Sequence, residues 1–326
     1  MKAAVIARYG SPGVIEIRDV PAPTPGPGEV LIRVHATTVN RTDCGELRHP
    51  FLIRMLAGGG RPRRQILGMD FAGTVEALGE GATLFKPGDA VFGMCPYGKE
   101  GAQADYLCMA ETGPIAAMPV NLRFDRAVLC EGAYYAKPAV DHFDLKPGDR
   151  ILVYGASGAI GSAGLQLAKL SGADVTAVVA GRHLELARSL GADAVVDYAT
   201  EAFDRLGRDY DVVWDTVGKL RRRHWRRLLK PGGIFSTTDL GPRGQHMWPL
   251  LWSWITRSGR AVVPLPKRAS GQAFVNDLKA KIETGQFIPV IDRSYRLADI
   301  ADAYRYVQTG QKAGIVVIDV AGDVPA

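Results

Sequence analysis

The chain has 326 residues, of which 47% are hydrophobic, and a formal net charge of +6. This length is enough for about two domains, and so small an excess of positive charge does not by itself indicate nucleic acid binding. The four cysteines form no C-x-x-C pair, so they predict no metal framework and fit a reducing, cytoplasmic compartment. No apolar run approaches the roughly 20 residues that cross a bilayer, and the chain runs directly into a charged alternating strand, so we expect neither a transmembrane segment nor a signal peptide.

Residues 1 to about 122 contain short alternating apolar runs that predict strands. Proline and glycine separate these runs, most densely between Pro21 and Gly28. Many short strands with such turns are typical of a distorted barrel. The predicted strands are Ala3–Arg8, Val14–Arg18, Glu29–Thr37, Asp70–Leu78 and Asp89–Phe92.

From about Leu122 helical and strand patterns alternate, which is typical of a parallel sheet with connecting helices. Helices are predicted at Asp125–Val140, Leu184–Leu190 and Arg221–Leu229, and a further helix follows the glycine-rich turn described below. The predicted strands are Arg150–Tyr154, Asp174–Val179, Ala194–Val196, Asp211–Trp214, Gly233–Thr237 and Ala261–Pro264.

The last part of the chain predicts helices at about Gln272–Glu283 and Leu297–Gln308, then a strand at Gly314–Asp319. This final strand has no place left in the alternating β-α-β series. We therefore expect it to return to the first domain.

A glycine-rich turn lies between the strand that ends at Tyr154 and the following helix. The first glycine permits the turn, the second lets backbone N–H groups approach a pyrophosphate, and the third lets the helix pack closely on the sheet. The open N-terminus of the helix completes an anion site. The spacing G-x-x-G-x-x-G departs from the usual G-x-G-x-x-G, but the β-α-β-α-β context favours dinucleotide binding over a packing turn without a ligand. The residues of the turn are Gly155, Ala156, Ser157, Gly158, Ala159, Ile160 and Gly161.

The end of the second strand of this series predicts which dinucleotide binds. Folds that prefer NADH place an acid about 20 residues after the glycines to hold the ribose 2′-OH. Here Val179 is followed by Arg182 and His183, and no acid occurs before Glu185. A guanidinium at this turn suits a 2′-phosphate, so we expect NADPH rather than NADH. The alternative is that Arg182 is a solvated residue at a helix start.

Eight segments of the chain together carry a resemblance to one family. They are Val39–Asp43, Leu67–Gly73, Phe85–Gly93, Gly101–Tyr106, Gly155–Gly161, Asp215–Gly218, Lys230–Gly233 and Gly310–Val317. Over nearly its whole length the chain resembles the medium-chain dehydrogenase/reductase superfamily, in its zinc-independent quinone oxidoreductase-like branch. The resemblance implies an α/β fold with a GroES-like β-barrel catalytic domain, residues 1–122 completed by 267–326, and a Rossmann NADP-binding domain with a doubly wound parallel sheet, residues 123–266. The active site is expected in the cleft between the domains.

The chain departs from the zinc alcohol dehydrogenases of the same superfamily at their metal ligands. Their first ligand cysteine falls at Asn40 and their ligand histidine falls at Met69, and the four-cysteine lobe that binds structural zinc is missing. Neither Asn nor Met substitutes for a ligand in a catalytic zinc site. The resemblance therefore implies an enzyme without zinc, in which Cys44 is a packing residue.

Without a Lewis acid an unactivated alcohol is a poor substrate, because nothing lowers the pKa of its hydroxyl. The implied chemistry is hydride transfer from NADPH to a small-molecule electrophile, either a quinone or an α,β-unsaturated carbonyl, with the protein positioning the substrate and hydrogen-bonding its oxygen. The resemblance places Asn40, Thr42, Asp43 and Tyr135 at the nicotinamide as catalytic candidates. It places Tyr198 beside the adenine and Lys312 near the cofactor. The alternative is that Asn40 and Asp43 only fix a loop and that Tyr135 is a core residue.

Three further stretches are assigned mainly to structure. The basic run Arg221–Arg227 predicts a solvated helix face with Trp225 and Leu228 turned inward, in preference to a nucleic acid or membrane contact. The Trp-rich run Met247–Ile255 predicts a dimer interface or a pocket wall, with peripheral membrane contact as the alternative. The Gly- and Arg-rich stretch Arg48–Gln65 is predicted to be a loop over the cleft.

We therefore expect a cytoplasmic, homodimeric, NADPH-dependent oxidoreductase without zinc and without nucleic acid partners. Two other enzymes of the same superfamily stay open: an enoyl-thioester reductase, which needs a channel for an acyl carrier, and an NAD(P)-dependent alcohol dehydrogenase. An alternative of another class is a non-catalytic NADPH-binding sensor or a membrane-associated protein, which would bind the cofactor without turnover.

Overall fold

The structure is a computed structural model that describes residues 1–48, 62, 64–96, 99, 101–200, 206–256, 258, 260–265 and 271–322. Its contacts divide the chain into two compact units. Unit 1 comprises Met1–Glu131, Ala269–Gly285 and Pro289–Ala326, and unit 2 comprises Gly132–Arg268 and Gln286–Ile288. Residues 123–131, which the sequence prediction assigned to the nucleotide-binding domain, thus group with unit 1. Most of the predicted loop over residues 48–65 lies outside the described residues.

Unit 1 is built on a mainly antiparallel sheet. The long strand β3 (Glu29–Val39) lies at its centre and pairs with β4 (Asp70–Leu78), β6 (Tyr106–Ala110) and β15 (Ile315–Asp319). On this path β5 (Ala90–Met94) and β7 (Ile115–Ala117) extend one edge, and β14 (Ile291–Arg296) extends the other. The strands β1 (Lys2–Ile6) and β2 (Ile15–Asp19) form a separate antiparallel pair.

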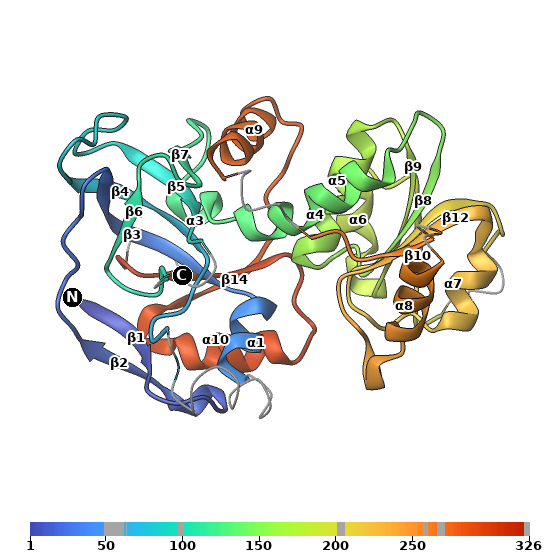
Figure 1. Ribbon diagram of the computed structural model, residues 1–326, viewed down its shortest axis with the longest axis horizontal. Coiled ribbons are helices and arrows are strands. Elements are labelled where there is room, and N and C mark those ends of the chain that lie inside the picture. Colours follow the sequence, from blue (N-terminus) through green and yellow to red (C-terminus); the bar gives the residue numbers. More distant parts are fainter. Residues whose placement is uncertain are drawn as a thin grey trace. The chain divides into compact units, whose positions relative to one another are not determined.

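The last strand of the chain confirms the expectation that it returns to unit 1. Strand β15 is buried at every position and pairs antiparallel with β3, with Val316 opposite Val39. In Figure 1 the red C-terminal segment lies among the blue strands of the N-terminal part. Because an apolar five-residue strand cannot be exposed on both faces, its burial ties the end of the chain to the beginning.

Four α-helices lie entirely within the described residues of unit 1. They are α1 (Arg41–Arg48), α3 (Phe124–Ala127), α9 (Gly271–Glu283) and α10 (Ile300–Gln308). The apolar face of α10 buries Ile300, Ala303, Tyr304 and Val307 in one cluster with Leu47 of α1. This packing holds α1, and with it the start of the candidate site, against β15.

Unit 2 contains a parallel sheet in the order β10-β9-β8-β11-β12-β13, and the strand order reverses beside β8, as in a doubly wound fold. The strands are β8 (Arg150–Tyr154), β9 (Asp174–Val179), β10 (Ala194–Asp197), β11 (Tyr210–Asp215), β12 (Leu229–Thr237) and β13 (Ala261–Val262). The helices are α4 (Cys130–Phe143), α5 (Ala159–Leu170), α6 (Leu184–Ser189), α7 (Arg222–Leu228) and α8 (Met247–Ile255).

Two predicted elements differ from the structure. The helix expected over Asp125–Val140 is two helices, α3 and α4, because the backbone leaves the helical region at Val128. The Trp-rich run forms the helix α8, to which the sequence analysis gave no secondary structure. None of the described helices is long and apolar enough to cross a membrane.

Candidate active site

The junction between β3 and α1 in unit 1 is held by a side chain from the first turn of the helix. Asn40 lies between the two elements, and the carboxylate of Asp43 accepts its backbone N–H at 2.7 Å. This bond is one half of a capping box. The other oxygen of Asp43 accepts the backbone N–H of Gly68 at 3.0 Å. Asp43 therefore joins the start of α1 to the segment that leads into β4, and its side chain is buried.

The side-chain amide of Asn40 hydrogen-bonds four neighbours, one of which is Asp70, whose Oδ2 lies 3.5 Å from Nδ2. Its Nδ2 donates to Oε2 of Glu131 at 2.8 Å and lies 3.2 Å from Oγ1 of Thr38. Its Oδ1 accepts from Nζ of Lys312 at 3.4 Å. The Lys312 ammonium also donates to the carbonyl oxygen of Gly314. An ammonium carries three N–H donors, and these two bonds use two of them.

A third carboxylate, that of Asp70 at the start of β4, completes the arrangement. Its Oδ1 accepts the backbone N–H of Glu131 at 2.8 Å, and its Oδ2 accepts the hydroxyl of Thr38 at 3.2 Å. We refer to Asn40, Asp43, Asp70, Glu131 and Lys312 as the polar cluster. Four of its members are almost fully buried and Lys312 is half-buried.

Burial moves the pKa values of these groups toward neutrality. Desolvation, followed by the charge of Asp70, raises the pKa of Glu131 to about 7. Desolvation also raises the pKa of Asp43 and that of Asp70 well above the usual range of a carboxyl group. It lowers the pKa of Lys312 to about 8, against the attraction of Glu131. A cluster with such values can hold or release a proton near pH 7.

The donor set of this region does not fit a catalytic zinc ion. Within the described part of the chain no three His, Cys, Asp or Glu side chains are grouped so that they could hold a metal. The carboxylates of the polar cluster already accept backbone and amide N–H groups, and Cys44 is directed at the carbonyl of Tyr304, with Sγ to O at 4.0 Å. A catalytic zinc needs three such ligands and an open position.

In unit 2 the turn after β8 has the shape that the sequence analysis expected of its glycines. Gly155 has a φ of 83°, a left-handed conformation that favours glycine. A Cβ on Gly161 would lie 2.2 Å from the carbonyl oxygen of Gly155, so α5 approaches the turn too closely for any side chain there. No side chain caps α5 at its N-cap residue, Gly158. Because the first N–H groups of a helix attract an anion, the turn fits a dinucleotide pyrophosphate.

The neighbouring turn between β9 and α6 carries two basic residues, of which Arg182 is exposed and His183 is half-buried. Arg182 and His183 belong to a short 3-10 helix, Gly181–His183, and Nε of Arg182 lies 3.1 Å from Nε2 of His183. Tyr198 follows β10, is half exposed, and its ring centroid lies 6.2 Å from that of Tyr154. These residues would surround the ribose and adenine of a dinucleotide bound at the turn.

The structure thus brings several of the predicted residues together within unit 1. Asn40, Asp43 and Lys312 join in the polar cluster, and the Thr42 hydroxyl hydrogen-bonds Glu131. Tyr135 belongs to unit 2, where it is half-buried on α4 and its ring meets that of Tyr134 edge-on at 5.6 Å. Lys312, which the sequence analysis assigned to the cofactor, contacts Asn40 directly.

Sequence reasoning missed three acidic residues. Asp70 and Glu131 were not selected as candidate site residues. Each is a single acid within an apolar stretch, and this pattern could have indicated a site, because an acid that is buried must be paired. Asp197 was also missed. It pairs in register with Val179, and its Oδ2 would lie only 2.7 Å from a Cβ on Gly181, so a carboxylate stands close to the Arg182 turn.

Comparison with known proteins agrees with this fold. A family model described as "Alcohol dehydrogenase GroES-like domain" matches residues 26–124, and one described as "Zinc-binding dehydrogenase" matches residues 190–318. The chain is 31% identical to the chloroplastic quinone-oxidoreductase homolog of Spinacia oleracea, over 92% of each chain. It is 30% identical to 2-methylene-furan-3-one reductase of Solanum lycopersicum, over 98% of this chain and 79% of that one. The solved structure of the quinone oxidoreductase from Coxiella burnetii has a TM-score of 0.84 at 24% identity, over 98% of this chain and 99% of that one.

The two sheets and these similarities define a two-domain oxidoreductase with a GroES-like domain and a Rossmann domain, which confirms the predicted fold class. The chain belongs to the medium-chain dehydrogenase/reductase superfamily, in its quinone oxidoreductase-like branch.

Proposed function

We propose that the protein is a zinc-independent, NADPH-dependent oxidoreductase that reduces quinones or α,β-unsaturated carbonyl compounds by hydride transfer. The observation that carries this proposal is the bond between Lys312 and Asn40 in the polar cluster. It places a cation of lowered pKa, with one further N–H, beside buried carboxyl groups in a region whose donors do not fit zinc. The names of the two relatives described above, one a quinone oxidoreductase homolog and one the reductase of a conjugated methylene ketone, support the same substrate classes.

In this reaction the cofactor, when bound, would supply a hydride, that is, a proton together with two electrons, to an electrophilic carbon of the substrate. The negative charge then develops on the substrate oxygen. Lys312 binds that oxygen with its remaining N–H and transfers a proton to it, which leaves a neutral amine that solvent protonates again. Asn40 orients the ammonium through its Oδ1, and Glu131 fixes the amide of Asn40 at 2.8 Å. A general acid of pKa about 8 suits proton transfer at neutral pH.

The cofactor assignment rests on the two turns of unit 2. The first N–H groups of α5 would hold the pyrophosphate, and the guanidinium of Arg182 would hold the 2′-phosphate of NADPH. The carboxylate of Asp197 near Gly181 supports the opposite preference, since an acid at this place can hold a ribose 2′-OH. We propose NADPH because the turn carries two basic residues, and one of them, Arg182, is exposed.

The experiment that tests this function is the oxidation of NADPH, followed at 340 nm, with ortho- and para-quinones, alkenals and crotonyl thioesters as acceptors. It is run with and without a chelator and repeated with NADH. We expect turnover with quinones or alkenals that a chelator leaves unchanged. Alcohol oxidation that a chelator abolishes would show a zinc enzyme, whereas cofactor binding without turnover of any acceptor would show a non-catalytic protein. A preference for crotonyl thioesters would favour the enoyl-thioester reductase.

The cytoplasmic location and the homodimer stay predictions of the sequence. The result of the activity assay tests neither of them.

A further inference from the structure

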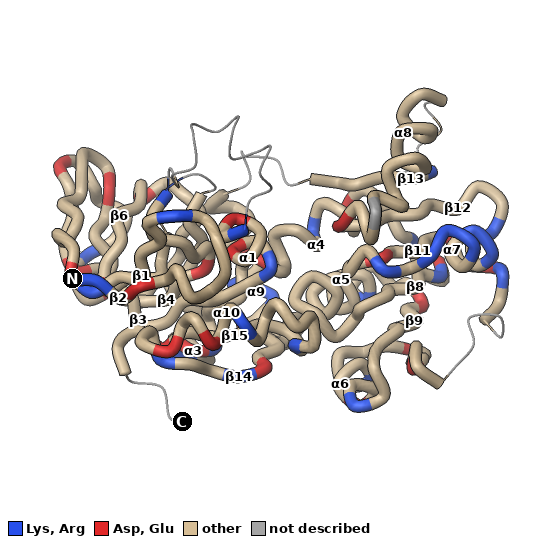
Figure 2. The backbone as a smooth tube through the Cα atoms, turned by 90° about the horizontal axis from the view of Figure 1, so that it is seen from below, with Lys and Arg blue, Asp and Glu red and all other residues tan. Residues whose placement is uncertain are grey.

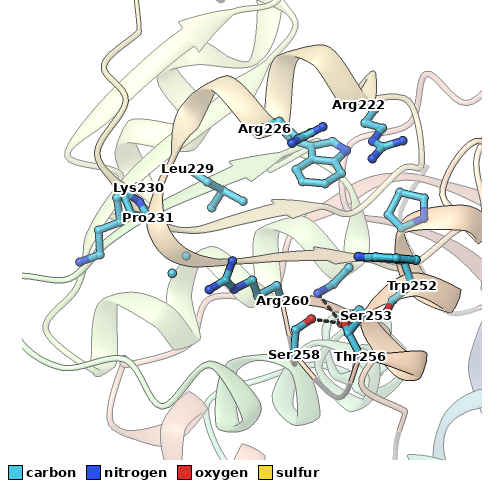
Figure 3. Close-up of a pocket in the computed structure, with 15 residues that line it drawn as sticks. Arg222, Arg226, Leu229, Lys230, Pro231, Trp252, Ser253, Thr256, Ser258 and Arg260 are labelled. Atoms are coloured by element: carbon cyan, nitrogen blue, oxygen red, sulfur yellow. Dashed lines mark hydrogen bonds between the residues drawn. The ribbon is translucent and has the colours of Figure 1, made fainter.

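The basic run and the Trp-rich run, for which the sequence analysis favoured a structural role, both line one cavity of unit 2. The basic helix α7 contributes Arg222 and Arg226, the Trp-rich helix α8 contributes Trp252, and Arg260 comes from the residue before β13. Figure 3 shows the arginines of α7 on one side of this cavity and Arg260 and Trp252 on the other. The cavity has a volume of about 640 Å³, which lies within the range of small-molecule sites. We call it the arginine cavity.

The arginine cavity is distinct from the dinucleotide turn. Its lining includes Leu229 and Ala261, which begin β12 and β13. The glycine turn follows Tyr154, which ends β8. Because all strands of the sheet are parallel, their amino ends lie at one edge and their carboxyl ends at the other. The cavity therefore lies at the opposite edge of the sheet from the glycine turn.

The positive charge of the arginine cavity has no counterpart in its lining. No aspartate or glutamate is among the described residues that line it. Arg222, Arg226 and Arg260 are exposed, and within the described part of the chain none of them forms an ion pair. The fourth cation of the lining, Lys230, pairs with Asp211. In Figure 2 the blue of Lys and Arg covers most of α7. Three unpaired guanidinium groups around one hollow attract an anion of more than one charge.

The remaining lining suits an anion with several acceptor oxygens. Trp225, which also lines the cavity, is buried, and its indole N–H has no acceptor among the described residues. Ser258 donates to Ser253 at 3.3 Å between hydroxyl oxygens, and both line the cavity. Trp252 is 57% exposed and adds an apolar surface beside the charges.

We propose that the arginine cavity binds a phosphate group, carried either by a small phosphate ester or by the headgroup of a lipid. A phosphate offers more acceptor oxygens and more charge than a single carboxylate, and the planar fork of arginine matches it with paired, charge-assisted hydrogen bonds. The binding site is independent of the proposed reductase activity.

Calorimetric titration of the whole protein with inorganic phosphate and pyrophosphate tests this site, with and without saturating NADPH. We expect binding that NADPH does not abolish, and the double variant Arg222→Gln/Arg226→Gln should raise the Kd for pyrophosphate at least tenfold. The control is Arg223→Gln, which removes one positive charge, half the change in the double variant, from an exposed position of the same helix that does not line the cavity. It should change the Kd less than twofold.

The proposal is overturned if neither anion binds at millimolar concentration, if NADPH abolishes binding, or if Arg223→Gln weakens it as much as the double variant. Circular dichroism checks that each variant is folded, which we expect because the three arginines are exposed.

Vesicles distinguish the two sources of the phosphate. Sedimentation with phosphatidylcholine vesicles is compared with sedimentation with vesicles that also contain phosphatidic acid. Co-sedimentation that requires phosphatidic acid and is lost in the double variant assigns the site to a lipid headgroup. Binding of pyrophosphate without co-sedimentation assigns it to a small phosphate ester.

Discussion

Asn40 shows how one residue can organise a site without carrying a charge. Its amide donates to Glu131 and accepts from Lys312, so it holds a carboxyl group and an ammonium group at two ends of one planar group. Because the acid is buried, its ionised form is poorly solvated, and its pKa rises. The same burial lowers the pKa of the lysine. The chemistry of the residues therefore depends on a residue that does not itself titrate.

The substitution Lys312→Arg separates charge from proton transfer. If the Lys312 ammonium is the acid, kcat/KM of the wild type falls as pH rises through about 8, because the group must be protonated to act. Arginine keeps the charge but stays protonated to well above pH 12. We expect the variant to lose on the order of tenfold or more in kcat/KM at pH 7 and to lose the decline near pH 8. Lys312→Met should lose at least as much activity, and an unchanged alkaline limb in either variant would falsify the assignment.

The substitution Glu131→Gln should flatten the pH dependence of stability. Between pH 4.5, the ordinary pKa of this carboxyl group, and about 7, its value in the folded protein, the folded state binds a proton that the unfolded chain has released. Stability therefore falls as pH rises through this interval. We expect the variant to show a decline in unfolding free energy that is shallower by on the order of 1 kcal/mol. Urea unfolding at several pH values measures this, with the exposed Glu16→Gln as a control that should leave the slope unchanged.

The substitution Arg182→Ala tests the cofactor preference. Loss of a charge-assisted bond to the 2′-phosphate should raise the KM for NADPH by roughly tenfold or more and leave the KM for NADH within about twofold. The control is Arg188→Ala on α6, whose arginine pairs with Glu185. Equal effects of Arg182→Ala on both cofactors would contradict a role in 2′-phosphate binding.

At the scale of elements, the start of α5 is positioned by neighbours rather than by a cap of its own. Asp215, at the end of β11, accepts the backbone N–H groups of Val217, Gly218 and Leu220. This fixes the turn after β11, and there the hydroxyl of Thr216 donates to the carbonyl of Tyr154 at 2.8 Å. The ends of two neighbouring strands thereby hold the glycine turn in place.

Two alanine substitutions in this turn should have different effects, one on stability and the other on cofactor binding. In Gly161→Ala the new Cβ would lie 2.2 Å from the backbone oxygen of Gly155, so α5 must shift, and we expect a loss of about 1–3 kcal/mol of stability. In Gly158→Ala the Cβ would meet only that oxygen, at 3.5 Å, so the fold should be retained while NADPH binding weakens. Thermal unfolding and cofactor titration measure both. Equal stability of the two variants would show that the close approach of α5 is not required.

At the scale of the whole molecule, the chain crosses between its units more than once. The C-terminal strand β15 completes the sheet of unit 1. In unit 2 the short strand β13 lies at the edge of the sheet, and among the described strands it pairs only with β12. Val263 and Leu265, just after β13, are 37% and 70% exposed. An edge strand followed by exposed apolar residues is a surface on which a second copy can pair.

The homodimer can be tested at this edge. We expect sedimentation velocity to give twice the chain mass of 35.1 kDa. The double variant Val263→Lys/Leu265→Lys should sediment as a monomer, since paired edges would bring like charges together. Leu170→Lys, on an exposed position of α5, is the control and should leave the mass unchanged. A wild type that is monomeric at tens of micromolar sinks the prediction.

Much of the fold could be predicted from the sequence because its signals are local. The strands β4, β8 and β9 have the predicted bounds, since each is an apolar run between turn residues whose period depends only on neighbours. The split of α3 from α4 could not be read in this way. It depends on the contacts of Val128 and Leu129, which are both fully or almost fully buried.

The sequence by itself determined the alternating strands and helices of unit 2, because propensity and turn chemistry are properties of short segments. Asn40 and Asp43 became candidates through the family resemblance of their motif. Only the tertiary structure decided that Asp70, Glu131 and Lys312, distant in the chain, surround Asn40, and that the arginines of α7 face a cavity shared with α8. The physical reason is that a pKa shift or an unpaired charge depends on burial and on distances between residues far apart in sequence. These are fixed only when the elements pack.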